Sequence, residues 1–191
     1  MRPLQSFNRP FGHISANFNP TGKHLCAVKN GISIDTTMGL GLQCGVLQNN
    51  RIGDMDPYII FHLVEECGME LGEVKKMLQS QSGLLGLSGG VSNDLRDIQE
   101  AADNGNEDCQ NALKAYAYGI KKYIGAYTAA MGGVDAIVFG GGVSRAGQPI
   151  LDGVRKSFKK WGYHACQDTQ FRLATLGNDA GAYGAFKLVA E

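Results

Sequence analysis

The chain has no excess of either charge and no long apolar run. Lysine plus arginine and aspartate plus glutamate number 18 each, so the net charge is zero and there is no electrostatic case for binding nucleic acid or an anionic membrane. No apolar run approaches the roughly 18 residues that a membrane span requires. The first residues lack the apolar stretch of a signal peptide, so we expect no leader.

The number and spacing of the cysteines argue against two kinds of site. The five cysteines are odd in number and form no CxxC pair, so neither a disulfide framework nor a zinc site is predicted (Cys26, Cys44, Cys67, Cys109, Cys166). The four histidines have no metal-ligand spacing either. A reducing cytoplasm is the simplest location for such a chain. With 191 residues, 43% of them hydrophobic and 19% charged, the chain can form a full core.

Glycine is the residue in excess. It accounts for 27 of the 191 positions, about twice the typical roughly 7%. The glycines gather at 39–45, 83–90, 132–133, 140–142 and 177–184. Because glycine permits positive φ and close approach of the backbone to a ligand, these loops favour a site built from backbone, as phosphate and nucleotide sites often are. For any single cluster, a tight turn in an α/β fold is the simpler interpretation.

The order of the predicted elements is typical of an α/β layer. Residues 1–22 are poorly specified, apart from a strand expected near 12–17. Asn30-Gly31 between two short apolar runs predicts a β-hairpin, because a type I′ turn needs positive φ at both positions. A long loop follows over 37–53, and 82–91 is a second, glycine-rich loop. Helices are expected at 57–67, 71–79, 93–102, 106–131, 148–160 and 178–189, and strands at 24–28, 32–35, 135–139 and 170–174. The first of these helices has an apolar face, and the helix at 106–131 has one apolar stripe that should be buried (Ile59, Ile60, Leu63 and Val64; Ala112, Tyr116, Ile120, Tyr123, Tyr127 and Met131).

Three features have residue types that suit binding or catalysis. The strand, Gly140-Gly141-Gly142 and the helix after them indicate an anion or nucleotide site, because a helix N-terminus offers unpaired N–H groups. Arg96 lies at a helix start beside a glycine loop, where it could clamp a phosphate. A surface helix that is capped by an aspartate would show the same sequence pattern. Arg51, in the long loop, could stabilise a transferring phosphoryl group or be a solvated charge. The carboxylates after it suit helix caps and Mg²⁺ ligands equally.

Five stretches, in order, resemble the C-terminal half of acetate kinase. They are AVKNG at 27–31, IDTTMG at 34–39, RIGDMDP at 51–57, LSGGVSNDLRD at 87–97 and AAMGGVD at 129–135. Two later stretches, FGGGVSRAG at 139–147 and ATLGNDAGAYGA at 174–185, instead resemble the end of sugar kinases of the ROK family. The change near 135–140 suggests a recombined or engineered hybrid. Both families belong to the actin-like ATPase superfamily.

The resemblance implies a fold, a reaction and a set of site residues. The fold would be an actin-like ATPase lobe with a mixed sheet and flanking helices, one nucleotide-binding lobe over 23–191 after a poorly specified segment at 1–22. The reaction would be ATP-dependent phosphorylation of a small carboxylate such as acetate, with ATP or ADP and Mg²⁺ as cofactors. Arg51 would stabilise the phosphoryl transition state. The nucleotide would be held by Asp94, Leu95, Arg96, Gly140, Gly141, Gly142, Val143 and Ser144.

The departures from the family pattern are equally specific. The family's second phosphate motif, His-Leu-Gly-Asn-Gly, falls at 18–22, where only Gly22 remains. We expect the N-terminal catalytic lobe to be missing, so that the chain has little or no activity unless another chain supplies that lobe. Two alternatives stay open. One is a non-enzymatic nucleotide-binding or structural lobe, a homodimer through exposed apolar helix faces, and the other is a ROK-type sugar kinase or regulator.

Overall fold

The computed structural model describes residues 11–19, 22–141, 169–175 and 179. The chain divides into two compact units. The sheet unit contains residues 1–19, 25–36 and 124–191, and the helical unit contains residues 20–24 and 37–123. The helices expected at 148–160 and 178–189 lie outside the described residues.

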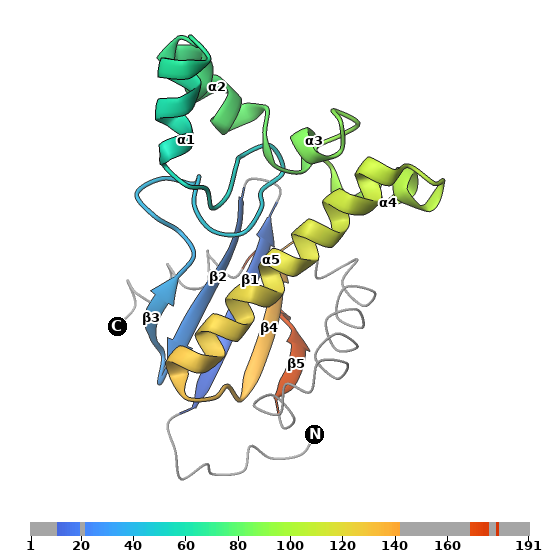
Figure 1. The fold of residues 1–191 in the computed structure, drawn as a ribbon. Helices are drawn as coiled ribbons and strands as arrows, with labels where there is room; N and C mark the ends of the chain where they lie inside the picture. The colour runs from blue at the N-terminus through green and yellow to red at the C-terminus, as the bar shows by residue number, and fades with distance from the viewer. Residues whose placement is uncertain (1–10, 20–21, 142–168, 176–178, 180–191) are drawn as a thin grey trace. The chain divides into compact units, whose positions relative to one another are not determined.

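The sheet unit is built on a five-stranded mixed sheet (Figure 1). The strands are β1 (Gly12–Asn19), β2 (Gly22–Lys29), β3 (Ile32–Thr36), β4 (Ala136–Gly141) and β5 (Gln170–Leu173), in the order β3-β2-β1-β4-β5. β1 runs parallel to β4 and β4 parallel to β5, while β2 and β3 form an antiparallel hairpin. The predicted turn of that hairpin is confirmed, since Asn30 and Gly31 have φ of 54° and 79°.

Alternating burial explains why these segments form strands. Ile14, Ala16 and Phe18 on β1 are buried, and the ring of Phe18 stacks on that of Phe139 on β4 with centroids 6.0 Å apart. A buried carboxylate fixes the start of both strands: Asp135 Oδ2 accepts a hydrogen bond of 2.8 Å from the backbone N–H of Gly12. The Asp135 N–H donates to the Gly12 carbonyl, also at 2.8 Å. This exchange sets the parallel register of the two central strands.

The helical unit holds the remaining elements. They are α1 (Tyr58–Phe61), which continues into the π-helix η1 (His62–Glu66), α2 (Leu71–Ser80), α3 (Gly83–Leu87), α4 (Leu95–Asp103) and α5 (Glu107–Met131), whose last turns from 124 onward belong to the sheet unit. The expected helices at 57–67, 71–79, 93–102 and 106–131 are confirmed within a few residues. The expected apolar stripe of α5 is buried at Ala112, Tyr116 and Ile120.

Two details differ from the sequence predictions. The segment 82–91 is not all loop, because α3 forms at its start; the N–H groups of Leu84 and Leu85 donate to the Gln48 and Asn49 carbonyls, and this tertiary pairing outweighs the weak helix propensity of glycine. The expected apolar face on α1 and η1 is not buried in the described structure. No helix among the described residues is both long and apolar enough to cross a membrane.

Candidate functional site

Arg51 lies in a loop that is attached to α2 and α3 by backbone hydrogen bonds. The residues on either side of it are both held: Ile52 N–H donates to the Leu78 carbonyl at 3.1 Å, and Ser82 N–H donates to the Asn50 carbonyl at 3.0 Å. A loop that is otherwise irregular is thereby fixed at the position of the arginine. The predicted functional residue therefore has a rigid backbone support.

Gly83 allows this loop to approach the start of α3. Its φ is +66°, and a Cβ at this position would come within 2.7 Å of the Arg51 carbonyl oxygen and 2.5 Å of the Gln48 carbonyl oxygen. Any side chain here would displace the Arg51 loop. The glycine excess predicted close backbone approach, and at Gly83 the approaching group is another backbone segment.

The carboxylates after Arg51 hold the loop and the next helix. Asp54 Oδ1 accepts a 2.7 Å hydrogen bond from Gly45 N–H, and its Oδ2 accepts a 2.5 Å bond from the Tyr123 hydroxyl. Asp56 Oδ1 accepts from Tyr58 N–H at 2.9 Å, at the start of α1. Of the two interpretations open in the sequence, the described structure favours caps and loop braces.

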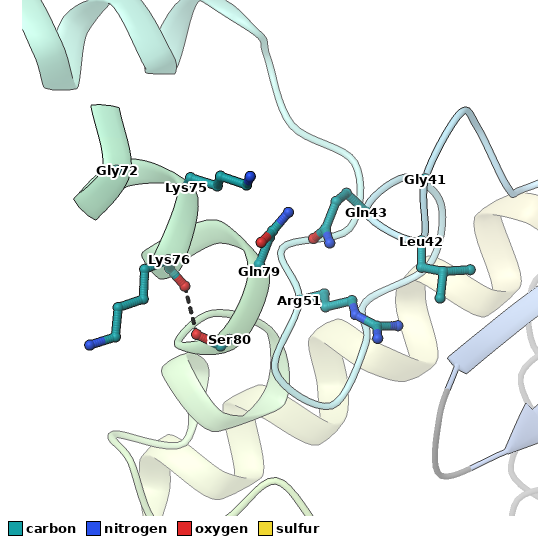
Figure 2. A pocket seen from close by; sticks show the side chains of 9 residues that line it. All are labelled: Gly41, Leu42, Gln43, Arg51, Gly72, Lys75, Lys76, Gln79 and Ser80. Atoms are coloured by element: carbon teal, nitrogen blue, oxygen red, sulfur yellow. Dashed lines mark hydrogen bonds between the residues drawn. The ribbon is translucent and has the colours of Figure 1, made fainter. Parts of the chain in front are cut away.

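A pocket of about 660 Å³ opens between this loop and α2, and we call it the Arg51 pocket (Figure 2). Its α2 wall consists of residues spaced as one helical face, and the loop supplies the other wall (Gly72, Lys75, Lys76, Gln79 and Ser80; Gly41, Leu42, Gln43 and Arg51). The volume lies within the range of small-molecule sites. Sequence reasoning identified Arg51 but missed the rest, because on its own the polar face of α2 is typical of a solvated helix surface.

The predicted nucleotide triplet forms the start of α4. Asp94 caps the helix, accepting from Arg96 N–H at 2.9 Å, and its carboxylate also accepts from Arg96 Nη2 at 2.6 Å and Nε at 3.1 Å. These hydrogen bonds lower the pKa of Asp94 to about 2 and raise the pKa of Arg96. The Arg96 side chain is 83% exposed, so its guanidinium lies at the surface, folded back on the cap.

Lys23 is a buried cation that sequence reasoning missed. Its backbone is held on both sides by the Gln48 amide, with Lys23 N–H donating to Oε1 at 2.7 Å and Nε2 donating to the Lys23 carbonyl at 2.6 Å. Lys23 is only 5% exposed, and its Nζ lies 4.6 Å from the centroid of the Tyr116 ring. The ammonium has no hydrogen-bond partner among the described residues. Burial lowers the pKa of Lys23 to about 8, partly offset by the charge of Asp94.

The other predicted nucleotide segment begins at the end of β4, in the sheet unit. Gly140 and Gly141 are buried there, and Gly141 has a φ of +79°. A Cβ on Gly140 would lie 2.6 Å from Asn17 Oδ1. The strand before the glycine run is thus confirmed, whereas Gly142, Val143 and Ser144 lie outside the described residues.

The acetokinase family matches residues 11–181. The chain belongs to that family. The acetate kinase of Desulforamulus reducens is 49% identical over 122 residues, which are 64% of this chain and 31% of that protein. The acetate kinase of Acetivibrio thermocellus is 38% identical over 161 residues, 84% of this chain and 39% of that protein. The chain thus spans about a third of the length of its acetokinase relatives.

Solved structures agree with this assignment. The acetate kinase of Porphyromonas gingivalis matches with a TM-score of 0.66 and 43% identity, covering 70% of this chain and 33% of that one. The acetate kinase of Entamoeba histolytica matches with a TM-score of 0.70 and 30% identity, covering 80% of this chain and 39% of that one. The expected fold class, a mixed α/β lobe of the actin-like ATPase type, is therefore confirmed.

The hypothesis of a hybrid gains no support. The acetokinase match runs through the expected seam at 135–140 and on to residue 181. The ROK hexokinase of Thermus thermophilus matches the fold with a TM-score of 0.52, but at 17% identity this likeness shows the fold alone. The sugar-kinase resemblance expected at 139–147 and 174–185 falls largely outside the described residues.

The acidic residues near Arg51 bear on whether the described part of the chain could hold Mg²⁺. Mg²⁺ prefers carboxylate oxygens together with substrate phosphates. Within the described ranges no three acidic, histidine or cysteine side chains come together as a metal site. Asp54 and Asp56 are already used by the hydrogen bonds given above. The described side chains therefore form no Mg²⁺ site of three or more protein ligands.

Proposed function

We propose that this chain supplies phosphoryl- and nucleotide-contacting residues of an acetate kinase-like phosphotransferase, which uses ATP to phosphorylate a small carboxylate. The observation that carries the proposal is the fixed position of Arg51 in a stretch that matches the acetokinase family. The guanidinium donates hydrogen bonds to the oxygens of the transferring phosphoryl group and stabilises the charge that spreads over them. Its rigid backbone lowers the cost of holding that geometry.

The nucleotide contacts are proposed at two places. In the helical unit, Asp94, Leu95 and Arg96 form the α4 start, and Arg96 leaves its carboxylate partner to contact the nucleotide. In the sheet unit, the end of β4 at Gly140 and Gly141 offers backbone without side chains. The high exposure of Arg96 supports its role, since a surface guanidinium can change partners at little cost.

We further propose that the chain on its own turns over slowly, in a reducing cytoplasm. Phosphoryl transfer depends on several positioned cations, and here one fixed arginine is assigned to the phosphoryl group. The described cysteines, Cys26, Cys44, Cys67 and Cys109, are all free thiols, which suits that compartment.

A homodimer is proposed on the apolar side chains of α1. Tyr58 and Phe61 are 70% and 54% exposed, and together with Ile59 they form an unburied apolar group. Light scattering at increasing protein concentration tests this proposal. A monomer at all concentrations for both the wild type and Phe61→Asp would refute it.

Calorimetric titration with Mg-ADP is the primary experiment. We expect the wild type to bind, Arg96→Ala to bind about tenfold or more weakly, and Arg172→Ala, which removes another exposed arginine, to bind like the wild type. Formation of acetyl phosphate from acetate and ATP is then compared in the wild type, Arg51→Ala and Arg51→Lys. Loss of turnover in both variants with unchanged ADP binding supports the role of Arg51. A folded wild type that does not bind Mg-ADP refutes the proposal, and binding without any turnover favours a non-enzymatic nucleotide-binding lobe.

A further inference from the structure

Asp54 closes the loop that contains Arg51. Its backbone N–H donates to the Gly45 carbonyl at 2.9 Å, and the Gly45 N–H donates to Asp54 Oδ1 at 2.7 Å. Gly53 permits this close approach, because its φ is +78° and a Cβ there would lie 3.1 Å from the Gly45 carbonyl oxygen. The base of the loop is therefore a fixed point, three residues along the chain from the arginine.

Tyr123 connects that base to the longest helix. Its hydroxyl donates to Asp54 Oδ2 at 2.5 Å, so the two oxygens of the carboxylate accept from two segments that are far apart in the chain. Both residues belong to the helical unit. A hydrogen bond to an ionised acceptor is roughly twice as strong as one between neutral groups. The orientation of the carboxylate, and with it the end of the loop, is thus set from α5.

This bond holds the loop from a second direction. The backbone hydrogen bonds on either side of Arg51 run to α2 and to the start of α3. The bond from Tyr123 runs instead to α5, so the arginine backbone cannot shift along α2 and α3 without stretching the contact between Tyr123 and Asp54. Phosphoryl transfer is sensitive to such a shift, because a displacement of about 1 Å can cost about a hundredfold in rate.

We propose that Tyr123 is a positioning residue for Arg51 and acts through Asp54, so that its hydroxyl sets the contact of the guanidinium with the transferring phosphoryl group. The inference rests on the role proposed for Arg51 above. It predicts that loss of the Tyr123 hydroxyl weakens binding of a nucleotide that carries the terminal phosphoryl group and leaves the affinity for ADP, which lacks that group, unchanged. A purely structural role would change both affinities or neither.

Calorimetric titration with the magnesium complexes of ADP and of the β,γ-imido analogue of ATP tests the proposal, because the analogue keeps a terminal phosphoryl group that it cannot transfer. The quantity compared is the affinity for the analogue divided by the affinity for ADP. Arg51→Ala should lower this ratio about tenfold or more. Tyr123→Phe, which keeps the ring that faces Lys122, should lower it about three- to tenfold. Tyr118→Phe is the matched control: it removes an exposed hydroxyl from the same helix and should change the ratio less than about twofold.

Variants of Asp54 test the route of the effect. Asp54→Ala should lower the ratio at least as much as Tyr123→Phe, and Asp54→Asn, which keeps one acceptor oxygen, should retain more of it. In the double variant Tyr123→Phe/Asp54→Ala the loss should equal that of Asp54→Ala alone, because both substitutions remove the same bond. If the two losses multiply instead, Tyr123 acts by another route and the inference is wrong.

The outcomes separate this inference from the proposed function. If Arg51→Ala lowers the ratio and Tyr123→Phe does not, the inference is wrong and the role of Arg51 stands. If the folded wild type binds neither nucleotide, or if Arg51→Ala leaves the ratio unchanged, both are wrong.

Amide hydrogen exchange over residues 45–54 reports the contact itself. Exchange should rise in Tyr123→Phe and stay unchanged in Tyr118→Phe. Asp54 is exposed, so water can solvate its carboxylate when the hydroxyl is removed, and Tyr123→Phe should fold. A rise in exchange without a change in the affinity ratio would make this bond a brace of the fold alone and would overturn the inference.

Discussion

The buried ammonium of Lys23 makes an energetic prediction that can be worked out from the structure. Burial lowers its pKa from 10.5 to about 8. At about 1.4 kcal/mol for each tenfold change in proton affinity, this difference destabilises the folded protein by about 3 kcal/mol at pH 7. The contact with the Tyr116 ring returns about 1–2 kcal/mol. We therefore expect Lys23→Met, which keeps an unbranched apolar stem, to raise the free energy of unfolding by about 1–2 kcal/mol at pH 7.

The sign of the pH dependence follows from the same difference. Below pH 8, Lys23 is protonated in the folded and the unfolded states, so the full cost of burying the charge applies. Between about pH 8 and 10.5 the folded state releases its proton first, and the free energy of unfolding of the wild type rises with pH. Above pH 10.5 Lys23 is neutral in both states, so the cost of burying its charge is absent. The advantage of Lys23→Met over the wild type should therefore be largest at pH 7 and shrink as the pH approaches 10.5.

Urea unfolding followed by circular dichroism at pH 7, 8, 9 and 10 measures this effect. Differences between variant and wild type remove the contributions of other groups that titrate in this range. Lys114→Met, on the exposed side of α5, is the control and should shift the free energy of unfolding by less than about 0.5 kcal/mol at every pH. If Lys23→Met destabilises the protein and leaves the pH slope of the wild type unchanged, the ammonium has a compensating partner and the reasoning is wrong.

Three further predictions concern the backbone supports. Gly83→Ala should destabilise the protein by about 2 kcal/mol in urea unfolding, because the new Cβ would collide with the Arg51 carbonyl and the backbone has a φ of +66°. Gly72→Ala is the control and should not destabilise the protein, because the space around Gly72 is open. Equal effects of the two substitutions would contradict this prediction. Asp135→Ala should cost about 1.5–3 kcal/mol by leaving a buried N–H unpaired, and Asp135→Asn, which keeps an acceptor, should cost less by the same assay. Asp94→Ala should cost about 1 kcal/mol at pH 7 by removing the α4 cap. Because Arg96 depresses the pKa of Asp94 to about 2, this difference should persist above pH 3.8 and fade toward pH 2, and a constant difference would refute it.

The fold was largely predictable because its signals are local. Asn30-Gly31 specifies a hairpin turn by its backbone angles alone, and the spacing of Ala112, Tyr116 and Ile120 specifies a buried helical face. α3 was not predictable, since its first turns are stabilised by carbonyls of a loop about 35 residues earlier in the chain. Likewise, periodicity gave α1 an apolar face but could not say whether anything packs against it.

The candidate site was predictable only in part, because some of its features depend on contacts between residues far apart in the chain. Arg51 and the Asp94–Arg96 triplet were found through stretches that keep the family pattern. Lys23 was not found, because its burial is set by the Gln48 amide, which holds the Lys23 backbone from 25 residues away. A lysine beside Gly22 carries no sign in the sequence that it will be enclosed.

The Arg51 pocket shows how one contact turns an ordinary surface into a possible site. Lys75, Gln79 and their neighbours lie on one face of α2, and an isolated helix would leave such a face in water. The bonds from Ile52 to Leu78 and from Ser82 to Asn50 bring the loop against that helix and make the face one wall of a concavity. Gly83 is the residue that permits this approach. If Gly83→Ala moves the loop as expected, it should lower the acetyl phosphate formation for which we propose Arg51, even though the arginine itself is still present. Unchanged acetyl phosphate formation by a folded Gly83→Ala variant would show that the role proposed for Arg51 does not depend on this loop contact, and the pocket would then be no more than a charged helix surface.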